Sequence, residues 1–80
     1  MATIWRLPSV RAEYGKSRTS IYEDINRGLM TKPVRLGARA VGWPAEEVKK
    51  ITAARVAGKD DAEIRVLVNK LEDARKEVTA

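Results

Sequence analysis

The segment from Ser17 to Trp43 constrains the fold most, because its periodicity changes halfway from helical to extended. Its first part, SRTSIYEDINRG, begins with a serine that can cap a helix and ends with a glycine suited to a left-handed closing residue. Its second part, PVRLGARAVGW, alternates apolar residues around a glycine-containing turn. The pattern predicts a helix followed directly by a small hairpin.

Capping and closing residues predict a shorter helix before this segment. Ser9 is expected to cap a helix of about two turns that stops at Gly15. The tight turn YGK then leads to the helix that follows Ser17. That second helix is expected to run to Arg27, with Gly28 as its closing residue.

Two further helices are predicted after the hairpin. Pro44 suits the first turn of a helix that carries Glu46 and Glu47 near its positive end and stops at Gly58. Asp60 and the glutamate three residues later have the spacing of a capping box. The final helix is amphipathic over about five turns, and its apolar stripe comprises Ile64, Leu67, Val68, Leu71 and either Ala74 or Val78.

The second helix has an apolar and a polar face. Ile21 and Ile25 lie four residues apart, and Leu29 extends their side beyond the helix end as an expected core contact. The opposite face carries Arg18, Thr19, Tyr22, Glu23 and Asn26. Because the chain has no phenylalanine, its core is expected to include the large rings of Trp5, Tyr14 and Trp43.

The predicted fold is mainly α with a small β-hairpin and a C-terminal amphipathic helix. Residues 1–58 are expected to form one domain that contains the first three helices and the hairpin, and residues 59–80 a helical extension. With 80 residues, the chain has little core of its own. The stripe within residues 60–78 is therefore expected to pack on Val48 and Ile51, and packing against a second copy is the alternative.

Positive charge is concentrated in the first half of the chain. The formal net charge is +5; residues 1–43 contain eight lysines and arginines against three acids, whereas residues 44–80 contain eight of each. This distribution predicts a half that binds a polyanion, joined to a neutral structural half. The alternative is that the extra charge only keeps a small protein soluble.

The absence of cysteine and histidine removes the usual zinc ligands, thiol nucleophiles and imidazole bases. Asp60 and Asp61 are better explained as a helix start than as catalytic carboxylates. We therefore expect no enzyme site, no metal and no cofactor.

Uncharged runs are too short to span a bilayer, and the first residues lack the apolar core of a signal peptide, so we expect a cytoplasmic protein.

Two short helices joined by a tight turn are the arrangement that places a recognition helix in the DNA major groove. Arg18 could donate two hydrogen bonds to guanine, Asn26 could pair with adenine, and Glu23 could accept from a cytosine amine. In the alternative interpretation, Arg18 only neutralises a phosphate and Asn26 is solvated. Glu23 would then pair with Arg27, four residues further on.

The hairpin adds a basic wing beside this helix. Val34 and Leu36 share one face of its first strand, so Arg35 points to the other, and Arg39 lies at or just after the tip. Such a loop can follow the backbone or enter a narrow, A/T-rich minor groove; a solvated turn is the alternative. The candidate DNA-binding residues are Ser17, Arg18, Thr19, Tyr22, Glu23, Asn26 and Arg27 in the helix, and Lys32, Arg35 and Arg39 in the wing.

The segment RLPSVRAEYGKSRTSIYEDINRGLMTKPVRLGARAVGWPAEEV, about half of the chain, resembles the AlpA family of prophage regulators, which is similar to excisionases. Its most specific parts are SRTSIY, PVRLG and VGW. The resemblance implies a winged helix-turn-helix of the MerR or excisionase type in residues 1–58. In this domain the second helix and the wing would bind double-stranded DNA in a sequence-specific manner. By position, the family's contacts fall on Ser17, Arg18, Thr19, Tyr22, Arg35 and Arg39, whereas Glu23 and Asp24 replace the basic or apolar residues usual there.

The resemblance implies two related functions. One is a recombination directionality factor, or excisionase, which bends attachment-site DNA so that an integrase excises the element, with copies associating along the DNA. The other is a transcriptional regulator of an integrase or prophage promoter. An alternative of another class is an adaptor that binds a protein through its C-terminal helix, in which case replacing Arg18 and Arg39 would leave partner binding intact.

Overall fold

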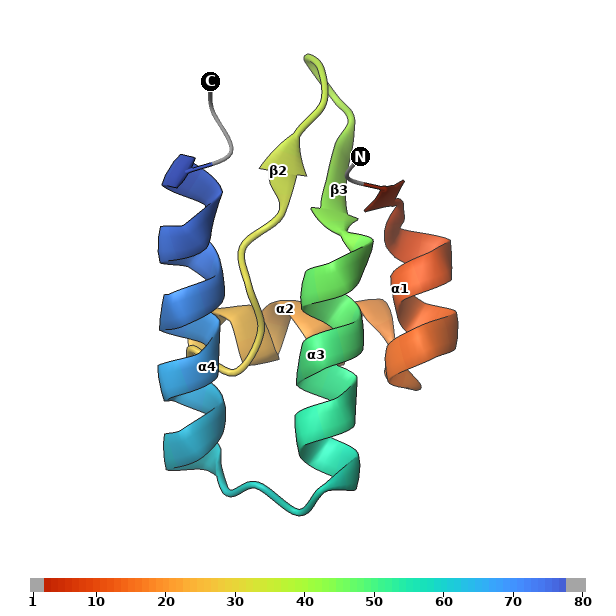
Figure 1. Ribbon diagram of the computed structural model, residues 1–80. Coiled ribbons are helices and arrows are strands. Elements are labelled where there is room, and N and C mark those ends of the chain that lie inside the picture. Colours follow the sequence, from red (N-terminus) through yellow and green to blue (C-terminus); the bar gives the residue numbers. More distant parts are fainter. Residues whose placement is uncertain (1–2, 78–80) are drawn as a thin grey trace.

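The computed structural model describes residues 3–77, which form four α-helices, a short 3-10 helix and a three-stranded antiparallel sheet. Helices α3 and α4 lie side by side, α2 crosses behind them, and the hairpin projects from one end (Figure 1). This confirms the predicted mainly helical fold with a small wing. The elements are β1 (Ile4–Trp5), α1 (Leu7–Tyr14), α2 (Arg18–Asn26), β2 (Val34–Arg35), β3 (Val41–Pro44), α3 (Ala45–Val56), α4 (Asp61–Ala74) and η1 (Arg75–Glu77).

Helix α1 begins earlier than the sequence predicts. Its N-cap is Arg6, and no side chain caps it, so the prediction of Ser9 as the cap is wrong. Pro8 explains the earlier start, because its fixed φ angle and missing amide hydrogen suit the first helical turn. Gly15 ends the helix in the left-handed conformation, with φ at 76°, as predicted.

Helix α2 has the predicted caps. The Ser17 hydroxyl accepts a hydrogen bond from the Ser20 amide at 3.3 Å, and Gly28 follows the helix in the left-handed conformation, with φ at 76°. Ile21 and Leu29 are buried and Ile25 packs against the same cluster, which confirms the predicted apolar face. The polar face therefore points away from the core.

The hairpin is confirmed, but the structure adds a strand that the sequence pattern did not indicate. β1 pairs with β3 and gives the order β1-β3-β2, so β3 is the central strand. Two residues are too few to show alternation, which is why β1 escaped prediction. Gly42 allows β1 to pack closely against β3. A Cβ atom at Gly42 would lie 2.5 Å from the Ile4 Cγ2 atom and 3.0 Å from the Trp5 carbonyl oxygen.

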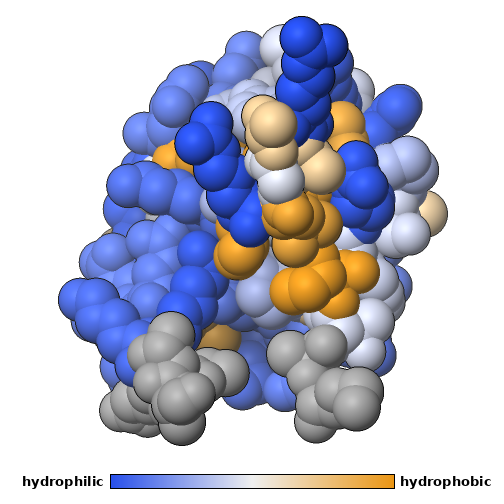
Figure 2. Space-filling model, turned by 90° about the horizontal axis from the view of Figure 1, so that it is seen from above, coloured by the Kyte–Doolittle hydropathy of each residue, from blue (hydrophilic) through white to orange (hydrophobic). Residues whose placement is uncertain are grey.

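The strand register leaves one apolar side chain of the hairpin outside the core. Val34 lies opposite Gly42, so Val34 and Leu36 share the sheet face opposite to that of Trp43. Leu36 is accordingly 46% exposed. Apolar surface lies between strongly hydrophilic side chains at this end of the molecule (Figure 2).

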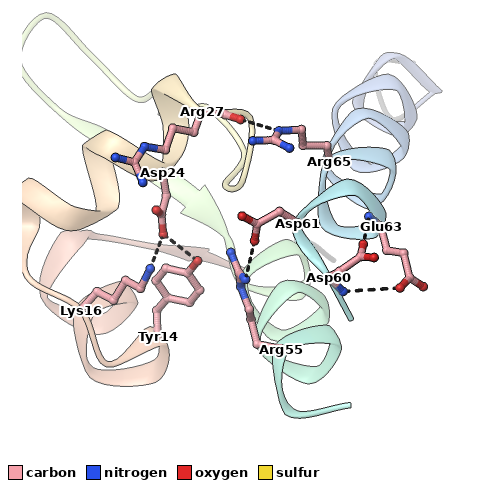
Figure 3. A network of polar contacts seen from close by, with 9 residues as sticks. All are labelled: Tyr14, Lys16, Asp24, Arg27, Arg55, Asp60, Asp61, Glu63 and Arg65. Atoms are coloured by element: carbon pink, nitrogen blue, oxygen red, sulfur yellow. Dashed lines mark hydrogen bonds and ion pairs between the residues drawn. The ribbon is translucent and has the colours of Figure 1, made fainter. Parts of the chain in front are cut away.

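Helices α3 and α4 begin much as predicted. Pro44 ends β3 and is the N-cap of α3, one position before the predicted first turn, and Gly58 follows the helix with φ at 83°. Asp60 and Glu63 form the predicted capping box of α4, and Arg55 of α3 donates to Asp61 at 3.1 Å (Figure 3). The α-helix ends at Ala74, and the alternative stripe residue Val78 lies outside the described residues.

The buried cluster draws on both halves of the chain. Trp43 is fully buried, as predicted, and its ring nitrogen donates to the Thr31 carbonyl at 2.9 Å; Trp5 and Tyr14 pack at the edge. Helix α4 contributes Ile64 and Val68, beside Val48 and Ile51 of α3. The cluster comprises Val10, Ile21, Leu29, Met30, Trp43, Val48, Ile51, Ile64 and Val68.

Candidate nucleic-acid interface

The outward side of α2 is one continuous polar surface. A shallow, open depression is lined by the five residues that the helical pattern assigns to this side: Arg18, Thr19, Tyr22, Glu23 and Asn26. All of them are exposed except Tyr22, which is partly buried. The surface has the shape of a contact face for a large partner rather than that of an enclosed small-molecule site.

Tyr22 connects this surface to the core and orients Arg18. Its ring meets the buried Trp43 ring edge-on, with 6.3 Å between centroids and 68° between planes. The Arg18 guanidinium lies over the Tyr22 ring at 5.8 Å from its centroid. Arg18 makes no ion pair within the described residues, so its charge remains available to an external anion.

Ser17 lies at the start of α2, with its hydroxyl already engaged in the fold. The hydroxyl accepts from the Ser20 amide and donates to the Ser20 hydroxyl at 3.2 Å. Ser17 therefore stabilises the N-terminal end of α2, from which Arg18 and Thr19 project.

The two acidic residues of α2 have different surroundings. Glu23 is exposed and forms no ion pair with Arg27 in the described part of the chain, so the intrahelical pairing considered above is absent there. Asp24 is only 5% exposed and points inward. The Arg27 side chain is exposed, and its carbonyl accepts from Arg65 of α4 at 2.9 Å.

Asp24 fixes the turn between α1 and α2. Its carboxylate accepts hydrogen bonds from the Tyr14 hydroxyl at 2.9 Å and from the Lys16 ammonium at 2.7 Å (Figure 3). Burial, the hydrogen bond to Asp24 and the negative charge of that group raise the pKa of Tyr14 to about 12, although the nearby Arg55 guanidinium acts in the opposite direction. An acidic residue that looks out of place in a basic surface thus holds the helix pair together.

The wing side chains are exposed: Lys32, Arg35 and Arg39. The tip is closed by a hydrogen bond from the Leu36 amide to the Ala40 carbonyl at 2.8 Å. Arg35 lies opposite Val41 in the sheet. Both Lys32 backbone groups are bonded to side chains of the C-terminal part, namely Glu72 and Arg75.

A second depression extends the basic region beyond the predicted residues. It lies beside the start of α2 and is lined by Pro8, Arg11, Ala12, Gly15, Lys16 and Ser17. Arg11 is exposed there, and Lys16 keeps 40% of its side chain exposed despite its bond to Asp24. Neither residue was among the predicted contacts. In the sequence, Arg11 and Lys16 contributed only to the excess of positive charge in the first half. A net charge does not show which charged side chains lie on the same face of the folded protein.

The described residues contain no group of three or more acidic side chains arranged to hold a metal ion. Within residues 3–77, no helix combines the length and apolar character needed to cross a membrane.

Similarity to a known protein family covers β1 to α3. Residues 3–56 match the family described as "Prophage CP4-57 regulatory protein (AlpA)". A curated relative, "Uncharacterized protein ORF88" of Enterobacteria phage P4, is 41% identical over 54 residues, or 68% of this chain. That alignment spans only 61% of the relative's own length. No solved structure matches the chain.

Proposed function

Because the chain belongs to the AlpA family of prophage regulatory proteins, we propose that it binds specific sequences of double-stranded DNA as a regulator of a prophage or mobile element. The observation that carries this proposal is the α2 surface. Five polar or amphipathic side chains line one open face, and Arg18 is held over Tyr22 without an ion-pair partner in the described residues.

In the proposed complex, α2 enters the major groove, which accommodates an α-helix. Arg18 and Asn26 are the side chains suited to bidentate contacts with guanine and adenine. Arg35 and Arg39 of the wing contact the backbone or the minor groove, and Lys32 supplies a further phosphate contact. Phosphate contacts supply most of the affinity, and the α2 side chains select the sequence.

We further propose that the protein acts as a recombination directionality factor that bends attachment-site DNA for an integrase. The exposed Leu36 beside the wing arginines supports bending, because apolar side chains inserted between base steps kink DNA. The family's description as regulatory supports the related alternative, in which the target is an integrase or prophage promoter. Copies of the protein associating along the DNA would extend a bend at closely spaced sites.

The first test is to mix the purified protein with fragmented DNA from its source near physiological salt and to sequence the bound fragments. Enrichment of closely spaced repeats is expected. Repeats beside an integrase attachment site, together with faster excision when protein is added, would support the directionality role. Repeats at a promoter would support transcriptional control instead. Recovery of fragments without any sequence preference would overturn the proposed recognition by α2.

A salt titration tests the proposed mechanism separately. With about four to six phosphate contacts, the logarithm of the affinity should fall against the logarithm of salt concentration with a slope of about −4 to −5. A slope near −1 would contradict binding through a basic helix and wing. Replacing both Arg18 and Arg39 should cause a large loss of DNA binding, whereas an adaptor acting through its C-terminal helix would keep its partner.

A further inference from the structure

One helix holds both ends of the segment that joins α2 to the wing. This segment, residues 27–33, begins at the C-cap of α2 and ends just before β2. At its start, the Arg65 Nε atom donates to the Arg27 carbonyl at 2.9 Å. At its end, the Lys32 amide donates to the Glu72 carboxylate at 2.8 Å. Two side chains of α4 therefore form hydrogen bonds with the backbone of this segment at positions five residues apart.

The positions of these two side chains on α4 suit this role. Arg65 and Glu72 are seven residues apart, so they lie on the same side of the helix and about two turns from each other. Ile64 and Val68 beside them are buried in the core. The stem of Arg65 also covers Gly28, where a Cβ atom would lie 3.6 Å from the Arg65 Cγ atom. The contacts thus start from a helix that is itself fixed by packing.

A third side chain strengthens the hold at the wing end. Arg75, directly after α4, donates to the Lys32 carbonyl at 2.7 Å. Its guanidinium also donates to both carboxylate oxygens of Glu47 in α3, at 2.6 and 2.8 Å, and Glu47 is only 6% exposed. Arg75 therefore ties the wing end to α3 as well as to the C-terminal helix.

We infer that Arg65, Glu72 and Arg75 form a brace that sets the position of the wing relative to α2, so that both meet DNA in one register. The inference rests on the proposed function, and the three are positioning residues that need not touch DNA themselves. The brace lies beyond residues 3–56, the part that matches the family. Its effect is to convert two separate contact elements into one rigid surface, which raises affinity for the DNA by reducing the ordering cost of binding.

The test uses two brace variants, each with a control of equal charge change on the same helix. Arg65→Gln is compared with Lys70→Gln, and Glu72→Ala with Asp73→Ala. Lys70 and Asp73 are exposed and make no bond to residues 27–33. Arg75 is left intact because its loss would strand the buried Glu47 carboxylate. Hydroxyl-radical footprinting on the captured target then reports the protections from α2 and from the wing separately.

The brace variants should keep the α2 protection, weaken the wing protection and lower specific affinity about tenfold, the size of one good contact. Their controls should match the wild type. In the free protein, Glu72→Ala should also speed amide hydrogen exchange at Lys32 about tenfold. Equal loss of both protections, as in general destabilisation, or no change in either, would overturn the brace while leaving DNA binding intact. Failure of the wild type to bind DNA would overturn the proposed function itself, and with it the role of the brace.

Discussion

Helices α2 and α4 are both amphipathic, and each is capped by a side chain that accepts from an amide of its first turn. They differ in how their outward polar groups are used. On α2, Arg18, Glu23 and Asn26 are exposed, and neither Arg18 nor Glu23 forms an ion pair in the described residues. On α4, Arg65 and Glu72 are bonded to the backbone that follows α2. The difference separates the groups that we propose contact DNA from the groups that hold the segment after α2 in place.

The largest effect is expected where α4 enters the core. Ile64→Ala should lower the free energy of unfolding by about 2–5 kcal/mol, because it leaves a cavity at a fully buried position. Val66→Ala is the control, since Val66 is 55% exposed on the same helix and its truncation should change stability by less than about 0.5 kcal/mol. Urea unfolding measures both. Equal small effects would mean that α4 is a separable extension.

A smaller effect, on binding rather than on stability, is expected for α2. Arg18→Ala should weaken binding to the selected DNA by about 1–3 kcal/mol and relax the preference at one base position. Lys50→Ala removes the same charge from an exposed position of α3 and should change affinity much less. Titrations against the selected site and against a site mutated at one base give the comparison. A uniform loss on all sequences would reduce Arg18 to a phosphate contact.

Prediction from sequence succeeded where one local pattern decides the outcome. Ser17 with Gly28, and Asp60 with Glu63, are short-range signals, because a cap involves only residues within one turn. The AlpA resemblance was likewise carried by contiguous motifs, and the match over residues 3–56 confirms it.

Features set by distant residues were missed. β1 depends on the approach of Ile4 to Gly42, which no local pattern records. The inward direction of Asp24 depends on Tyr14 and Lys16 in the preceding helix and turn. The hydrogen bonds of α4 to residues 27–33 join positions about forty residues apart, so helical periodicity could predict the buried stripe but not the partners of the charged side.

The hydrogen bond from Tyr14 to Asp24, which fixes the turn before α2, predicts that the stability of the protein depends on pH in the alkaline range. Because the pKa of Tyr14 is raised from 10.0 to about 12, its stabilising contribution is complete below pH 10 and is lost as the pH rises through 12. The partly exposed hydrogen bond to Asp24 should make the wild type about 1 kcal/mol more stable than Tyr14→Phe at pH 9. That advantage should disappear between pH 10 and 12 in urea unfolding. Tyr22→Phe controls for loss of a hydroxyl, and a constant wild-type advantage up to pH 12 would contradict the role of Asp24.

The smallest effect is expected in the salt dependence of DNA affinity, which should change for a wing variant but not for an α4 variant. Arg39→Ala should reduce the magnitude of the salt slope by about 1, because one phosphate contact releases about one counterion. Lys70→Ala removes the same charge from exposed α4 and should leave the slope unchanged, since α4 is proposed to position the surface rather than to contact DNA. Affinities measured at salt concentrations from about 50 to about 200 mM give both slopes. Equal reductions for the two variants would mean that α4 also touches the backbone, and the division between a recognising helix and a positioning helix would then fail.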